Sequence, residues 1–130
     1  MQLLRFAAAL SSFFLLTLAG AEEKTVTWTG WFSDQQCASA RASSGAFTAT
    51  NPDCARACIE KGVAPAFISE QAKAVYLVKG YDHVIDDLGY HVEIQGAVDE
   101  AAKTVAIRKV TRLEYQGASC ARPRKVQFLP

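Results

Sequence analysis

The stretch KTVTWTGWFS, residues 24–33, decides the fold class. Most of its residues are β-branched or aromatic, and such residues are enriched in strands. Trp28 and Phe32 alternate with polar residues, which predicts a long strand with one buried face. Gly30 lies inside the run, and a glycine there often marks a bulge or a sharp bend. Such a bend would let Trp28 and Trp31 both reach the core.

The segment after this strand is predicted to carry one helix. Residues 38–50 are rich in Ala, Ser, Thr and Gly without a clear period, so we predict a loop there. A helix is predicted over residues 52–61, because Asn51 can cap it, Pro52 suits the first helical position and Gly62 supplies a stop. Its buried face is expected to carry Cys54, Ala57 and Cys58.

Two hairpins are predicted further along the chain, each from two short apolar runs separated by a polar turn. Their strands are residues 66–69, 74–79, 91–98 and 104–110. Between the hairpins, Asp82 can cap a short helix over residues 83–88 that Gly89 closes.

The resulting order is strand, helix-bearing insertion, two strands, short helix, two strands. It predicts a mainly β fold, a five-stranded OB-like Greek-key barrel with a helix-bearing insertion after strand 1 and a short helix between strands 3 and 4. A five-stranded sandwich and an SH3-like barrel are the alternatives. Strand alternation predicts one core, formed by Trp28, Phe32, Leu77, Val92, Ile94 and Ile107.

The first 21 residues have the pattern of a secretory signal peptide. Arg5 is their only charged residue, an apolar run covers residues 6–18, and residues 19–21 (AGA) form a small-x-small cleavage site. The apolar run is shorter than the roughly 20 residues that a membrane-spanning helix needs. We therefore predict a signal peptide (1–21), an OB-like domain (22–114) and a C-terminal tail (115–130), in the periplasm or secreted.

Charge and motifs narrow the function classes. The chain has 14 basic residues, of which Arg5 lies in the signal, and 13 acidic residues. The mature chain is therefore close to neutral, whereas nucleic-acid binders show a clustered basic excess, so no nucleic-acid partner is expected. No later stretch is apolar enough to span a membrane. No catalytic triad signature or phosphate loop is present, so we expect neither an enzyme nor a cofactor.

Four cysteines in an exported domain of this size predict two disulfides. They are Cys37, Cys54, Cys58 and Cys120. A bond between Cys54 and Cys58 is disfavoured, because residues four apart on a helix hold their Cβ atoms about 5–6 Å apart, beyond the ~3.8 Å of a disulfide. Two pairings stay open: Cys37–Cys54 with Cys58–Cys120, and Cys37–Cys58 with Cys54–Cys120.

A metal- or thiol-handling site is the competing hypothesis. Thiolates are soft ligands for zinc and copper(I), and the candidate ligands are Cys37, Cys54, Cys58, His83 and His91. Cys54, in the first turn of the predicted helix, is also a candidate reactive thiolate. Oxidation outside the cytoplasm competes with both uses, which favours disulfides.

Four segments resemble a family of small exported bacterial proteins of unknown function. They are residues 29–37 (TGWFSDQQC), 54–62 (CARACIEKG), 75–77 (VYL) and 91–99 (HVEIQGAVD). The resemblance implies an OB-like barrel and supplies no catalytic residue, and Cys120 lies outside it. We therefore expect an exported, non-enzymatic OB-like domain that binds a small ligand, a peptide or an envelope protein, with disulfides holding the insertion beside the barrel face.

Overall fold

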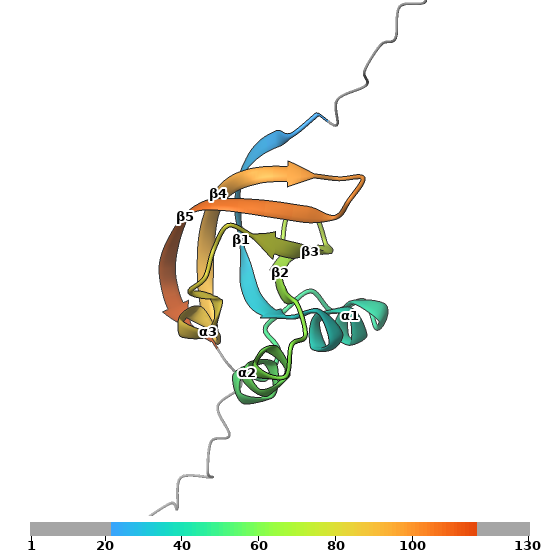
Figure 1. Cartoon of the computed structure of the whole chain (residues 1–130), viewed down its shortest axis with the longest axis vertical. Coiled ribbons are helices and arrows are strands. Elements are labelled where there is room, and N and C mark those ends of the chain that lie inside the picture. Colours follow the sequence, from blue (N-terminus) through green and yellow to red (C-terminus); the bar gives the residue numbers. More distant parts are fainter. Residues whose placement is uncertain (1–21, 117–130) are drawn as a thin grey trace, which may run out of the picture.

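The structure is a computed structural model that describes residues 22–116. The predicted signal peptide, Cys120 and residues 117–130 of the predicted tail lie outside the described residues. The described elements, shown in Figure 1, are β1 (Lys24–Asp34), α1 (Gln35–Ser43), α2 (Pro52–Glu60), β2 (Pro65–Ser69), β3 (Ala74–Lys79), α3 (Val84–Asp87), β4 (Tyr90–Asp99) and β5 (Thr104–Tyr115).

The five strands form a closed ring in the order β1-β2-β3-β5-β4, and β4 pairs again with β1. Only the short β3–β5 pair is parallel, and the other four pairs are antiparallel. The mainly β class and both hairpins are therefore confirmed. β5 is longer than predicted, because it continues to pair with β4 as far as Tyr115.

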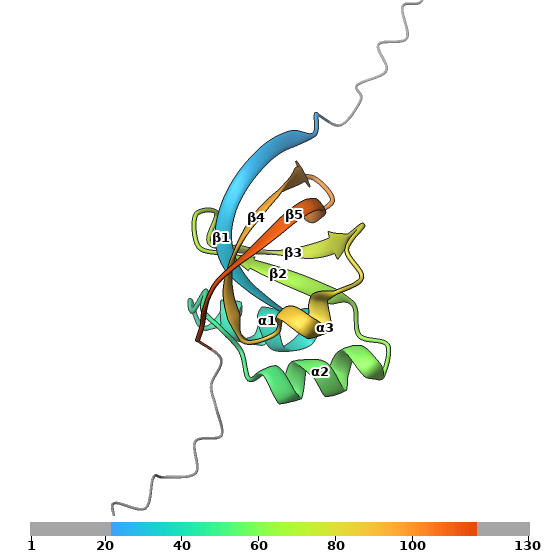
Figure 2. The same ribbon diagram turned by 90° about the vertical axis from the view of Figure 1, so that its left-hand side faces the viewer.

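Gly30 is the residue at which β1 changes partner. It lies opposite Val92 of β4 and also opposite Ser69 of β2. A Cβ atom at Gly30 would lie 1.8 Å from the carbonyl oxygen of Ile68, so the two backbones approach too closely for any other residue. Figure 2 shows β1 as a long curved strand.

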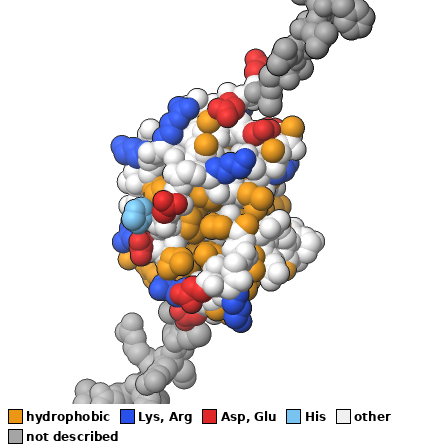
Figure 3. Space-filling model, viewed as in Figure 1, with side chains coloured by type: hydrophobic (Ala, Val, Ile, Leu, Met, Phe, Trp, Pro, Cys, Tyr) orange, Lys and Arg blue, Asp and Glu red, His pale blue; other side chains and the backbone are white. Residues whose placement is uncertain are grey.

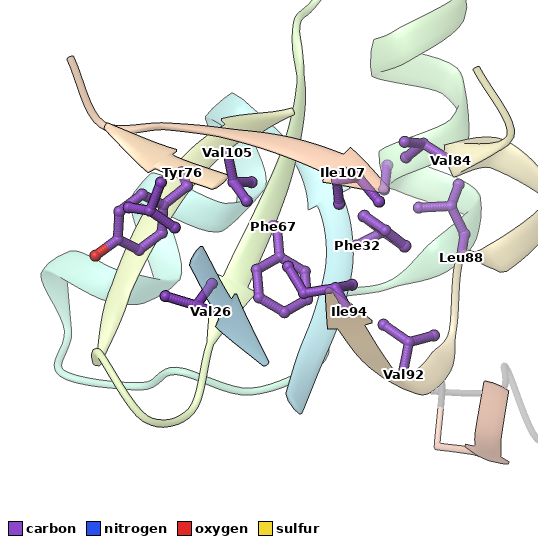
Figure 4. Packing of buried hydrophobic residues seen from close by; sticks show 12 residues of the cluster. Val26, Phe32, Phe67, Tyr76, Val84, Leu88, Val92, Ile94, Val105 and Ile107 are labelled. Atoms are coloured by element: carbon purple, nitrogen blue, oxygen red, sulfur yellow. The ribbon is translucent and has the colours of Figure 1, made fainter. Parts of the chain in front are cut away.

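One apolar core fills the ring (Figure 4). Its buried members are Val26, Phe32, Ala55, Phe67, Tyr76, Val84, Leu88, Val92, Ile94, Val98, Val105 and Ile107. Ala55 comes from α2 and Val84 from α3, so these two helices close one end of the ring. Four of the predicted core residues are confirmed, and Trp28 packs against the core while partly buried.

The prediction that Leu77 faces the core was wrong. Tyr76 takes the inward position of β3 and is 1% exposed, whereas Leu77 is half-buried. Residues 74–78 (AVYLV) are apolar on both faces of the strand, so the alternation of polar and apolar residues could not predict which face is buried. The ring of Tyr76 lies 5.0 Å from that of Trp28, and its hydroxyl donates to Glu100.

Trp31 is buried but lies outside the cluster that fills the ring, which corrects the prediction that a bend at Gly30 would bring it to the same core as Trp28. It is 6% exposed, but it is one residue away from the inward-facing Phe32 and therefore lies on the outer face of the ring. There its ring stacks on that of His91, with 4.9 Å between the centroids.

The loop predicted over residues 38–50 was wrong in its first part, because α1 covers Gln35–Ser43. Ala38 is its single buried residue and packs against Ala66 and Ile68 of β2, outside the ring. One small contact residue creates no helical period in the sequence, which explains why the pattern did not predict this helix.

The α2 helix begins as predicted, with Asn51 as its cap and Pro52 in its first turn. Its buried face differs from the prediction, since Pro52 and Ala55 are buried while Cys54 and Ala57 are exposed. The prediction buried the side of α2 that carries Cys54 and Cys58. In the structure, the side that carries Ala55 packs against the ring.

The short α3 helix is held by polar groups. Its cap position is His83 without a side-chain bond, so the predicted cap at Asp82 was wrong. Buried Asp87 accepts hydrogen bonds from the hydroxyl of Tyr81 and, at 2.6 Å, from Nε of Arg112 on β5. Burial, followed by this bond to Asp87, raises the pKa of Tyr81 to about 12, so the hydroxyl stays protonated and donates.

The face of the molecule that is seen in Figure 3 is partly apolar. Figure 3 shows hydrophobic side chains in its middle, with charged side chains around them. Among large apolar residues of the described chain only Leu113 and Tyr115 are exposed. No helix within residues 22–116 has the length and apolar character to cross a membrane.

Candidate functional site

Three side chains that can ligate a metal meet at the junction of β1, α1 and α2. Asp34 ends β1, Cys37 lies in the first turn of α1, and Cys58 lies in α2. The two Sγ atoms and a carboxylate oxygen of Asp34 all lie within 4.8 Å of one another. We call this group the Asp34–Cys37–Cys58 cluster.

Helix capping brings the first two members together. Asp34 is the N-cap of α1, and its Oδ2 accepts a hydrogen bond of 3.0 Å from the backbone N–H of Cys37. An N-cap side chain binds the N–H groups two or three residues later, so the carboxylate lies beside the side chain of Cys37. A bond of 2.9 Å from the N–H of Gln35 to the carbonyl of Ala64 joins the start of α1 to the segment that follows α2.

The electrostatics of the cluster are unusual for a folded protein. Asp34 is 0% exposed, and its Oδ1 has no hydrogen-bond partner among the described residues. Burying an acceptor without a partner is unfavourable, more so when it carries charge. The side-chain hydrogen bond of Cys37 to Asp34 and then burial raise the pKa of Cys37 to about 12. Its thiol is therefore protonated near neutral pH.

The structure brings together two of the five predicted metal ligands. Cys54 is exposed and lies outside the cluster, as do His83 and His91. His83 is exposed and lies 3.2 Å from Asp86, while His91 lies 2.8 Å from Glu70.

Cys37, Cys54 and Cys58 form no disulfide with one another in the structure. Both predicted pairings also need Cys120, which lies outside the described residues. Disulfide formation therefore stays a prediction.

The sequence did carry a signal for Asp34. The spacing D-x-x-C at the start of a helix places a capping carboxylate beside a thiol. The signal was missed because residues 38–50 were interpreted as a loop, so no helix was available for Asp34 to cap.

A cavity of about 490 Å³ lies beside the cluster, between α1, α2 and the segment that joins them. Its lining includes Cys37, Arg41, Asn51 and Cys54. Thr50, which also lines it, shares a buried hydrogen bond with Ser33 of β1, and this bond holds the connecting segment against the ring.

A second cavity, of about 460 Å³, lies on the outer face of the ring, and we call it the Trp31 groove. Its lining is Trp31, Arg41, Thr48, Ala49, Glu70, His91 and Gln116. The stacked rings of Trp31 and His91 form one part of this lining.

The charged groups of the Trp31 groove differ in how they are paired. Glu70 is held by His91, at 2.8 Å, and by the hydroxyl of Thr29. Burial acts to raise the pKa of Glu70, but the hydrogen bonds from Thr29 and His91 outweigh it and lower the pKa below its usual value. Arg41 donates to Thr48 at 3.2 Å and forms no ion pair within the described chain.

Comparison with models of known families, with curated proteins and with solved structures gives no match for this chain. The resemblance to the family of small exported proteins stays a prediction.

Proposed function

We propose that this chain is an exported, non-enzymatic, OB-like binding domain that takes a small ligand or a peptide in the Trp31 groove. The closed order of five strands, with a helix between β3 and β4, supports the OB-like interpretation. A fold alone does not imply a function, so the support for binding comes from the residues of the groove.

The observation that carries the proposal is an arginine without an ion pair beside an aromatic wall in the groove. Arg41 has no carboxylate partner among the described residues. The indole N–H of Trp31 also has no partner there, but it is buried. Glu70 is already bound by His91 and Thr29. A groove with an aromatic wall and an arginine without an ion pair suits a ligand that carries a carboxylate, because a carboxylate pairs with the guanidinium.

Peptides with and without a terminal carboxylate test this proposal. An ¹⁵N-labelled protein is titrated with an N-acetylated tripeptide that ends in a carboxylate, and in parallel with its C-terminal amide. We expect saturable shifts at the Trp31 indole and around Thr48 with the carboxylate form. Equal shifts for both peptides, or shifts scattered over the protein, would contradict the proposal.

A matched pair of variants sharpens the test. Arg41→Gln should weaken binding of the carboxylate peptide about tenfold, because a hydrogen bond to a charged group is worth about 1.5–3 kcal/mol. Arg56→Gln changes an exposed arginine on α2 that does not line the groove, and it should leave the affinity unchanged. An equal loss in both variants would mean that only net charge matters.

Export is the second part of the proposal. It is supported by the single arginine, the apolar run and the small-x-small site of residues 1–21. Expression of the full chain in a bacterium with a periplasm should give a periplasmic product whose mass begins at Glu22. A cytoplasmic product that retains Met1 would contradict this part.

Disulfide stabilisation is the third part of the proposal. The positions of the thiols favour one of the two pairings that the sequence left open. Oxidation of the cluster joins Cys37 to Cys58, which leaves the exposed Cys54 for Cys120. A disulfide between Cys37 and Cys58 closes a loop of about twenty residues, and it should stabilise the fold by on the order of 3 kcal/mol. Non-reducing peptide mapping should find the Cys37–Cys58 peptide, and a Cys37–Cys54 peptide would overturn the assignment.

A further inference from the structure

We propose that the Asp34–Cys37–Cys58 cluster, with both thiols reduced, binds one Zn²⁺ ion through two sulfur atoms and one carboxylate oxygen. This inference is independent of the Trp31 groove, whose lining includes none of the three residues.

The first supporting observation is the spacing of the ligand atoms. Zinc binds sulfur at about 2.3 Å and carboxylate oxygen at about 2.0–2.2 Å, so tetrahedral ligand atoms lie about 3.3–3.8 Å apart. The three atoms of the cluster already lie within 4.8 Å of one another. Small side-chain movements, with no change in the backbone, would close the site around the ion.

The second observation is independent of the first. Capping of α1 accounts for Oδ2 of Asp34, but Oδ1 is buried and has no partner among the described residues. An isolated buried carboxylate oxygen is unfavourable, and a cation in the cluster would satisfy it. The unmet oxygen belongs to the same side chain that meets the two sulfurs.

The chemistry of the three ligands selects the ion. Two thiolates favour zinc over magnesium or calcium, which prefer an all-oxygen shell. Binding replaces the two thiol protons, so one Zn²⁺ enters and two protons leave. Cys37 also lines the cavity of about 490 Å³, so a fourth coordination position would be open to solvent, as in zinc sites with three protein ligands.

Oxidation and metal binding exclude each other, because both use the sulfur atoms of Cys37 and Cys58. Zinc would therefore protect the pair from oxidation, and an oxidant that joins the two sulfurs would release the ion. The test accordingly starts from the mature chain, reduced and freed of metal under anaerobic conditions.

Cobalt(II) is the probe, because it occupies zinc sites and gives visible ligand-field bands and a thiolate-to-metal charge-transfer band. We expect saturation at one cobalt per chain and displacement by one equivalent of Zn²⁺. Absence of a stoichiometric thiolate–cobalt band would overturn the proposal.

Variants assign the ligands. Cys58→Ser and Asp34→Asn should weaken zinc binding at least tenfold, and asparagine still accepts the capping hydrogen bond of α1. Cys54→Ser is the matched control, because Cys54 lies one turn earlier on α2 and outside the cluster. Equal losses for Cys54→Ser and Cys58→Ser, or wild-type affinity for Asp34→Asn, would overturn the assignment.

A measurement on the wild-type chain avoids any effect of the variants on folding. The reduced protein is alkylated with and without one equivalent of Zn²⁺, and the modified peptides are identified by mass spectrometry. Zinc should slow alkylation of Cys37 and Cys58 at least tenfold and leave that of Cys54 unchanged. Equal protection of Cys54 would contradict the proposal as firmly as no protection at all.

Discussion

The ring of strands and the helical insertion after β1 are held in place by different interactions. The ring encloses large apolar side chains, such as Phe32, Phe67 and Ile94, at 2% exposure or less. In the insertion, α1 buries one alanine and α2 buries one proline and one alanine. Polar groups position it instead, including the cap at Asp34 and the buried hydrogen bond between Ser33 and Thr50.

This difference explains where chemistry is available. The described residues that fill the ring are mainly apolar, so a substitution there acts on the stability of the fold. The insertion brings two thiols to the buried carboxylate at the end of β1, and these groups have uses beyond packing. The two regions should therefore respond differently to substitution.

The largest effect is expected in the ring. Ile94→Ala should lower the free energy of unfolding by about 2–5 kcal/mol, because Ile94 is fully buried and its truncation leaves a cavity. Denaturant titration measures the change, with Leu113→Ala, at 49% exposure, expected within about 0.5 kcal/mol of wild type. Similar losses for both residues would mean that the strand register of the ring is wrong.

A smaller effect is expected at the junction of the ring and the insertion. Asp34→Ala should cost about 1–2 kcal/mol in metal-free protein, because α1 loses its cap. Hydrogen exchange should show faster opening of α1 while β4 keeps its protection. Asp34→Asn should stay close to wild type, and a loss in β4 equal to that in α1 would contradict the separation of the two regions.

A still smaller effect is expected inside the insertion. Thr50→Val leaves the hydroxyl of Ser33 buried without its partner, which should cost about 1 kcal/mol. A double-mutant cycle with Ser33→Ala isolates the bond, and the double variant should lose less than the sum of the two single variants. Strict additivity would show that the two hydroxyls do not interact.

The smallest effect concerns pH and the Trp31 groove. The pKa of Glu70 is lower in the folded chain than its usual value near 4.5. Its contribution to stability is therefore present above that value and is lost as the pH falls through the folded-state pKa. The stability advantage of wild type over Glu70→Gln should shrink below about pH 4.5. His91→Asn, which removes one partner of Glu70, should give an intermediate profile, and identical profiles for all three proteins would exclude this role.

The sequence predicted only part of the Asp34–Cys37–Cys58 cluster. Cys37 and Cys58 were among the predicted ligands, because thiolates are soft ligands for zinc and copper(I). Asp34 was not, since its role depends on a helix whose only buried residue is Ala38. Cys54 was predicted on the buried face of α2, and the structure places it at the surface.

Local sequence patterns by themselves determined the elements whose signals are strong. The alternation in residues 24–33 indicated a strand and Asn51-Pro52 the start of α2, because each reflects a backbone preference that acts within a few residues. Only the tertiary structure decided which face of an ambiguous segment is buried. The run AVYLV could have turned either Tyr76 or Leu77 inward, and the space inside the ring accepted Tyr76. The meeting of Asp34, Cys37 and Cys58 likewise depends on how α2 packs against the end of β1, a long-range contact that no short stretch of sequence encodes.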